Sequence, residues 1–242
     1  MRRLKILTWL GTICLLLGCG QGQSSEEVTS GYPDVQIAGA MRNVMWRGEL
    51  GGVIELDSIA NKQGLYGLGP VSYLQGEILL IDGQAFVSRV VSDSSMTVEE
   101  TYDVAAPFLV FANVNKWREM VLPAEVQNIG ELERWLDEAT VDAKRPFAFK
   151  LSGRVQQADI HIQNLPPGSK VSSPEEAHRG QTNYLLEDEN VDIVGFFSTE
   201  HQGVFTHHDS FLHMHLITAD RQQMGHLDAV SFKEMVLYLP EG

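Results

Sequence analysis

Short runs of apolar residues, separated by glycine, proline and acidic residues, recur along most of this chain. Apolar runs of this length that are bounded by turn residues are typical of β-strands. The pattern predicts strands at 77–82, 85–91, 108–114, 147–151, 155–163 and 191–197. Asp82-Gly83, between the first two runs, is typical of a tight hairpin turn.

Helical periodicity is confined to two stretches. At 129–139 the apolar residues Ile129, Leu132, Trp135 and Leu136 fall on one face, which predicts an amphipathic helix. A shorter helix is expected within 35–50, because apolar residues recur there every three or four positions.

Glycine and proline predict where the chain turns. The glycine-rich stretch 64–76 is expected to form loops, Ser152-Gly153 a turn, and 165–179 a long loop that could act as a lid. Strands therefore dominate and helices intervene irregularly. This pattern is typical of an α+β protein with mixed, largely antiparallel β-sheets and few helices.

The first 18 residues have the features of a targeting segment. Basic residues at positions 2, 3 and 5 precede an apolar run at 6–17 that is short for a membrane span. The run ends in Leu16-Leu17-Gly18-Cys19, which resembles the cleavage and lipidation motif of bacterial lipoproteins. We expect a lipoprotein signal peptide at 1–18, a lipid anchor on Cys19, a polar tether at 19–34 and a folded domain at 35–242. The alternative is an ordinary signal peptide that is cut slightly later.

The chain is strongly acidic. Its 242 residues include 18 basic and 32 acidic ones, for a net charge of −14. Segment 1–18 holds three of the basic residues and none of the acidic ones, so the remaining chain carries −17. This charge argues against binding to nucleic acid or to an anionic lipid surface, and suits an exported protein held outside the cytoplasm by its anchor.

The only cysteines, Cys14 and Cys19, lie near the start of the chain. No disulfide is therefore expected in the folded domain. A metal site there has to use histidine, aspartate or glutamate, since no thiolate is present.

Histidines concentrate near the end of the chain. Five of the eight lie between positions 207 and 226. If 211–218 is a β-strand, His213 and His215 point to the same face, because side chains alternate with a period of 2. A turn before Gly225 would bring His226 onto the adjacent strand. Three neutral imidazoles around an open position are typical of a catalytic zinc site.

Other interpretations of these residues stay open. The histidines could be solvated or packed in the core without a metal ion. His207 and His208 are expected in the loop that enters the strand, where one of them could hydrogen-bond a metal ligand. Glu77 begins a mostly apolar strand, so its carboxylate could lie in solvent or point into a cleft as an acid, a base or a metal partner.

Several motifs together resemble a known family, the bacterial α-acetolactate decarboxylases. Their order and approximate spacing match over 35–230. The motifs are Gly67-Leu-Gly69, Leu74-Gln-Gly-Glu77, Asp82-Gly83, Val194-Gly195-Phe196, His213-x-His215 and Gly225-His226.

The resemblance implies a fold and a chemistry. It implies two packed regions, here with a boundary near 140–150, and the capacity to form a homodimer. It implies zinc held by His213, His215 and His226, with Glu77 as a catalytic residue. The substrate would be a small 2-hydroxy-3-oxo acid, and the reaction would convert 2-acetolactate to acetoin while zinc stabilises the enolate.

Two positions depart from the family pattern. His161 stands where the family has an active-site arginine, so we assign His161 as a catalytic residue, although Arg154 or Arg179 could reach the site instead. Neither Glu234 nor Glu241 matches a second family glutamate. Two alternatives therefore remain: a divergent zinc lyase or hydrolase for another small oxo-acid, and a non-catalytic metal-binding surface lipoprotein.

Overall fold

A computed structural model describes residues 32–241 of the protein. The expected signal peptide at 1–18, Cys19 and most of the expected tether lie outside the described residues. Within 32–241, no helix is long and apolar enough to cross a membrane.

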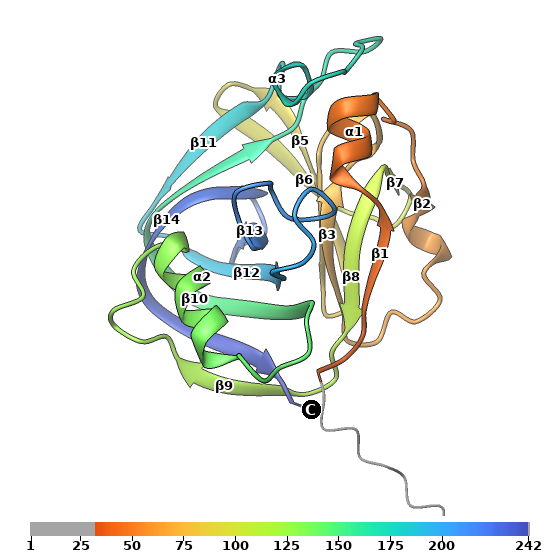
Figure 1. Cartoon of the computed structure of the whole chain (residues 1–242). Helices are drawn as coiled ribbons and strands as arrows, with labels where there is room; N and C mark the ends of the chain where they lie inside the picture. Colours follow the sequence, from red (N-terminus) through yellow and green to blue (C-terminus); the bar gives the residue numbers. More distant parts are fainter. Residues whose placement is uncertain (1–31, 242) are drawn as a thin grey trace, which may run out of the picture.

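Two six-stranded sheets make up most of the structure (Figure 1). The first has the strand order β1-β8-β3-β4-β5-β6. Its strands are β1 (Val35–Gly39), β3 (Leu65–Pro70), β4 (Glu77–Ile81), β5 (Gln84–Ser92), β6 (Ser95–Glu100) and β8 (Phe108–Asn113). A small sheet beside it pairs β2 (Ile54–Glu55) with β7 (Ala105–Ala106).

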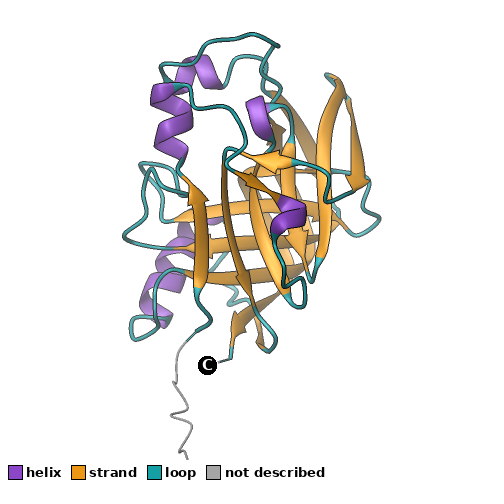
Figure 2. Cartoon of the chain, turned by 90° about the vertical axis from the view of Figure 1, so that its right-hand side faces the viewer, coloured by secondary structure: helices purple, strands orange, loops and turns teal. Residues whose placement is uncertain are grey.

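The second sheet has the order β11-β10-β12-β13-β14-β9. Its strands are β9 (Trp117–Val121), β10 (Phe147–Ile162), β11 (Thr182–Glu187), β12 (Asn190–Phe197), β13 (Leu212–Thr218) and β14 (Met224–Pro240). Because β10 also pairs with β14, this sheet curls until β10, β12, β13 and β14 form a closed ring. In Figures 1 and 2 its strands run across those of the first sheet.

Every pairing between these strands is antiparallel, and the described residues form three α-helices, α1 (Met41–Arg47), α2 (Ile129–Ala139) and α3 (Pro174–Ala177). The structure therefore confirms the α+β class with largely antiparallel sheets. The chain passes from the first sheet to the second between Asn113 and Trp117. A division into two sub-regions near 140–150 stays a prediction.

Helix α2 has the predicted bounds. The Asn128 side chain accepts a hydrogen bond from the Glu131 backbone N–H at 3.0 Å, which satisfies a donor at the start of the helix. Leu132 and Leu136 are fully buried against the second sheet. The apolar stripe thus fixes both the helix and the face that it buries.

Three predicted elements are wrong in their bounds. The stretch 35–50 holds strand β1 before the short helix α1, and the stretch 64–76 contains strand β3, whose six residues are all buried. The expected turn at Ser152-Gly153 lies inside the continuous strand β10. Gly153 is needed there because β14 comes very close: a Cβ atom would lie 2.0 Å from the Glu234 carbonyl oxygen. Local sequence cannot show this contact, since its partner is some 80 residues away.

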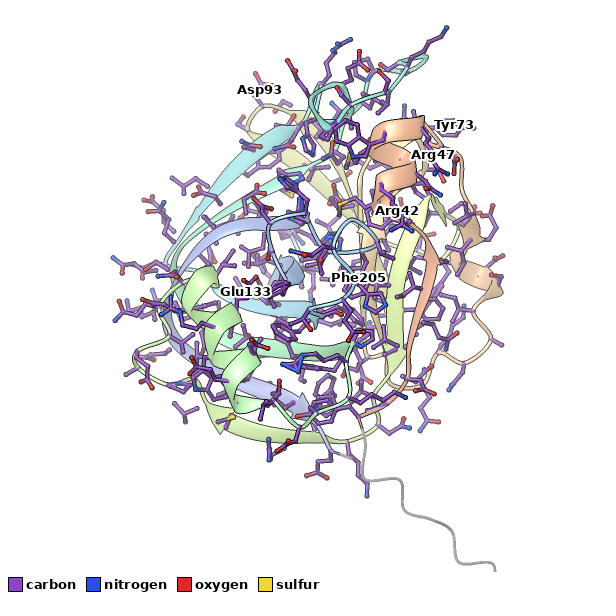
Figure 3. The ribbon with its side chains drawn as sticks, in the orientation of Figure 1. Arg42, Arg47, Tyr73, Asp93, Glu133 and Phe205 are labelled. Carbon is purple, nitrogen blue, oxygen red and sulfur yellow. The ribbon has the colours of Figure 1, made fainter. Side chains whose placement is uncertain are left out.

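The two sheets share a hydrophobic core. Leu68, Leu79 and Phe86 of the first sheet pack against Val194 and Phe196 of the second. This interface holds the start of β4 beside the strands that carry the histidines. Figure 3 shows the usual division around it: Phe205 is inside, and charged side chains such as Arg47 and Asp93 point outward.

Gly195 lies at a tightly packed point of the second sheet. A Cβ atom at this position would lie 2.2 Å from the ring of Phe149, which is fully buried and cannot move aside. We expect Gly195→Ala to lower the free energy of unfolding by about 1–3 kcal/mol, measured by urea denaturation. Gly130→Ala in α2 is the control, because its Cβ meets only one atom at 3.6 Å. Equal midpoints for Gly195→Ala and the wild type would contradict this account of the packing.

Candidate metal centre

Three histidines converge where β13 meets β14. His213 and His215 lie on the same face of β13, with ring centroids 5.2 Å apart. His226 on β14 is paired directly with His215 in the register, and its ring lies 5.0 Å from that of His213 and 5.4 Å from that of His215. One nitrogen from each ring falls within 4.8 Å of the others. The structure therefore brings together the three residues that the sequence predicts as ligands.

These imidazoles are buried and neutral. Burial, with smaller contributions from neighbouring histidines, holds the pKa of His213 and of His226 well below the usual range and lowers the pKa of His215 to about 3. A neutral imidazole has a free lone pair, and this is the form that binds a metal ion.

Unpartnered ring nitrogens in the cluster indicate that a ligand is expected. Nδ1 of His213 and both Nδ1 and Nε2 of His215 are buried and have no hydrogen-bond partner among residues 32–241. Leaving polar atoms desolvated costs free energy, so buried polar atoms almost always have a partner. A metal ion between the three rings would bind one nitrogen of each imidazole, and the donor set therefore fits a metal.

Glu77 approaches this cluster from the first sheet. It begins β4, is 2% exposed, and places Oε2 3.7 Å from Nε2 of His215. Its Oε1 accepts a hydrogen bond from the backbone N–H of Gln163 at 3.0 Å. Burial raises the pKa of the Glu77 carboxyl well above its usual range, and this hydrogen bond opposes the rise. The alternative that Glu77 is a solvated strand end is therefore wrong.

His161 lies next to His226, on the neighbouring strand β10. The two residues are paired across β10 and β14, and their ring centroids are 4.6 Å apart. The Nδ1 atom of His161 contacts both oxygens of Asp228 at 2.8 and 2.9 Å, and its Nε2 lies 3.3 Å from Nε2 of Gln163. Neither Asp228 nor Gln163 was predicted from the sequence as a site residue. Each follows a predicted site histidine by two positions, Asp228 within β14 and Gln163 one residue past the end of β10, so the period of 2 could have identified both.

His161, His226 and Asp228 also form a second group whose atoms could hold a cation. In this group His161 is already bonded to Asp228. The first group has the unpartnered nitrogens and is therefore the stronger candidate.

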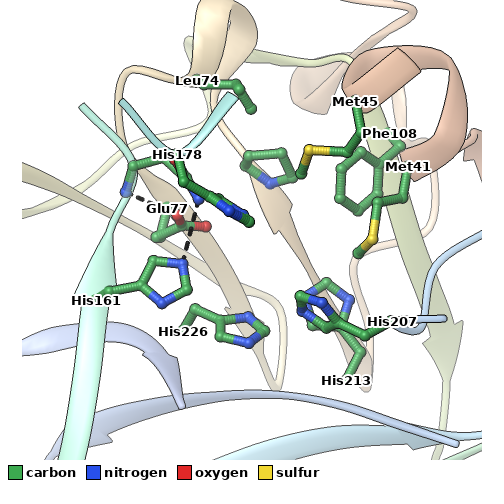
Figure 4. A pocket seen from close by; sticks show the side chains of 12 residues that line it. Met41, Met45, Leu74, Glu77, Phe108, His161, His178, His207, His213 and His226 are labelled. Carbon is green, nitrogen blue, oxygen red and sulfur yellow. Dashed lines mark hydrogen bonds between the residues drawn. The ribbon is translucent and has the colours of Figure 1, made fainter. Parts of the chain in front are cut away.

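The cavity above the three histidines has a volume of about 30 Å³. Figure 4 shows the side chains that line it. The polar ones are Glu77, His161, Gln163, His178, His207, His213 and His226, and the apolar ones are Met41, Met45, Pro70, Leu74 and Phe108. His178 and His207, from two different loops, were not predicted as lining residues.

Some residues that the sequence left as candidates lie elsewhere. Arg154 pairs with Asp188 at 3.4 Å, and Arg179 is exposed. Glu234 and Glu241 are exposed as well. None of these four side chains lines the cavity. His208 is in the predicted loop, and its side chain is 89% exposed.

Fold and site together define an α+β protein with a buried, histidine-rich site that could bind a metal ion. A family model described as alpha-acetolactate decarboxylase matches residues 39–241, nearly the whole described chain. The protein belongs to the alpha-acetolactate decarboxylase family, and the resemblance seen in its motifs is confirmed.

Individual relatives are distant. An alpha-acetolactate decarboxylase from Lactococcus lactis subsp. cremoris is 27% identical over 169 residues, which cover 69% of this chain and 67% of the relative. The crystal structure of acetolactate decarboxylase from Bacillus subtilis subspecies spizizenii is similar in fold, with a TM-score of 0.71, 21% identity and 86% coverage of each chain. A Staphylococcus aureus protein described as similar to this enzyme gives a TM-score of 0.69 at 19% identity, covering 86% of this chain and 85% of that one.

The geometry predicts a stabilising metal ion. We expect the metal-free protein to take up about one divalent transition-metal ion per chain. Free metal at 100 times its Kd would stabilise the fold by about 2.7 kcal/mol and raise Tm by roughly 5–10 °C. Elemental analysis and calorimetry would measure both. His215→Ala should abolish the uptake and His208→Ala should not; equal uptake by both variants would contradict the assignment.

Proposed function

We propose that this protein is a zinc-dependent decarboxylase that converts 2-acetolactate to acetoin. The observation that carries the proposal is the group of three buried, neutral imidazoles with the buried carboxyl of Glu77 beside it. Membership of the decarboxylase family supports the reaction class.

His213, His215 and His226 would hold the ion. Imidazole ligands favour zinc or copper over magnesium, and the described chain contains no cysteine to change that preference. Zinc bound there would supply a Lewis acid for the negative charge that develops on the ketone oxygen as carbon dioxide leaves. The cluster suits this role because its ligands are neutral and leave the charge of the ion intact.

Glu77 orients the substrate or takes part in proton transfer. Its Oε1 is fixed by the Gln163 N–H, which leaves Oε2 facing the cluster. The carbon that loses carbon dioxide must receive a proton to give acetoin. A carboxyl group whose pKa is raised by burial can hold that proton in place and deliver it.

His161 is the second catalytic residue of this proposal. Asp228 fixes its ring through Nδ1, and its Nε2 lies 3.3 Å from the amide nitrogen of Gln163. A substrate hydroxyl that displaces this amide would hydrogen-bond to Nε2. His161 would thereby help to orient the bond that breaks.

Acetoin formation from racemic acetolactate tests the proposal. We expect the zinc-loaded protein to form acetoin, Glu77→Gln to lower kcat by at least about 100-fold while retaining zinc, and His213→Ala to lose both zinc and activity. Acetoin would be measured colorimetrically and zinc by elemental analysis of the same samples. A zinc-loaded wild type that forms no acetoin would overturn the proposal.

A divergent zinc lyase or hydrolase is the second candidate. It is favoured by one observation: no arginine or lysine lines the cavity among residues 32–241. Zinc-dependent turnover of another small oxo-acid, with none of acetolactate, would support it. Zinc retained with no turnover of any such acid would point to a non-catalytic metal-binding lipoprotein.

We also propose that the protein is exported and anchored to a membrane through lipid on Cys19. The motif at 16–19 supports this location. We expect radiolabelled palmitate to be incorporated in bacterial cells and Cys19→Ala to abolish the labelling. Equal labelling of wild type and variant would show that Cys19 is not the anchor.

A further inference from the structure

The cavity requires a binding group for an anion. The proposed substrate carries a carboxylate, and burying an unpaired carboxylate is strongly unfavourable. Met41, Met45, Leu74 and Phe108 line the upper part of the cavity and offer no hydrogen-bond donor from their side chains. The donors therefore have to come from the polar side chains of the lining.

Most of those polar groups are already engaged. Glu77 is an acceptor held by Gln163, and His161 is held by Asp228. His213 and His226 belong to the candidate metal group. His178 and His207 remain, and both line the cavity. The imidazole hydrogen bonds within the described chain are those of His161 and His201, and none involves either of these two rings.

These two imidazoles come from separate segments. His178 follows α3 in the connection between β10 and β11, and its ring lies 6.4 Å from that of His161. His207 lies between β12 and β13, with its ring 5.2 Å from that of His226. Figure 4 shows His178 above His161 and near Glu77, and His207 beside His213.

We propose that His178 and His207 bind the substrate carboxylate through their N–H groups. This inference rests on the proposed function, because it assumes a carboxylate-bearing substrate at the metal group. An imidazole carries at least one N–H in either protonation state, so the pair can donate one hydrogen bond to each carboxylate oxygen.

Binding of an unreactive analogue tests this proposal. 2,3-Dihydroxy-2-methylbutanoate keeps the carboxylate but lacks the ketone, and butane-2,3-diol lacks the carboxylate. The full-length zinc-loaded protein would be titrated with each by calorimetry. We expect His178→Ala and His207→Ala each to weaken binding of the acid by roughly 10- to 100-fold, to leave binding of the diol unchanged, and to retain zinc.

His208→Ala is the matched control, because it removes the exposed neighbour of His207 and should bind both compounds as the wild type does. Variants that bind the acid normally, or that lose acid and diol equally, would overturn the inference. Failure of the wild type to bind the acid would also overturn the inference. Loss of zinc in His207→Ala would overturn it as well.

Acetoin formation, measured on the same samples, keeps the two proposals apart. If the wild type forms acetoin and the variants bind the acid normally, this inference fails alone. If the acid binds through both histidines but no acetoin forms, the proposed function fails and the carboxylate site stands.

Discussion

Desolvation of the imidazole cluster is the constraint on which the rest of the site depends. His213, His215 and His226 are removed from water by the strands that carry them, and this keeps them neutral. Neutral, buried and partly unpartnered nitrogens are unfavourable on their own and become favourable when they share a cation. The same packing thus makes the metal-free site unfavourable and gives the site its affinity for a metal.

That packing involves both sheets. The three imidazoles come from the second sheet, whereas Glu77 is carried by the first. The backbone of Gln163, at the end of β10, holds the Glu77 carboxyl and so ties the sheets together at the site. Any change that shifts one sheet against the other would therefore move the carboxyl relative to the imidazoles.

The sequence predicted the parts of the site that depend on local periodicity. The period of 2 put His213 and His215 on one face, and a turn supplied His226. The apolar stripe of α2 was likewise predicted from the sequence. The continuous strand β10 was not, because Gly153 has the local chemistry of a turn and only the distant strand β14 explains it. His178 was missed for a related reason: its place over the metal group is set by the folding of a long loop.

Charge connects the metal to substrate binding. Among the residues that line the cavity in the described chain, the only carboxylate is Glu77 and no cationic side chain is present, while the whole protein carries −14. Without a metal ion, such a site has nothing to attract an anionic acid from solution. A divalent cation on three neutral ligands reverses the sign of the local field, even with Glu77 ionised. In the proposed function, the imidazoles of His178 and His207 would then fix the position of a carboxylate attracted by the bound ion, and metal binding would precede recognition of the substrate.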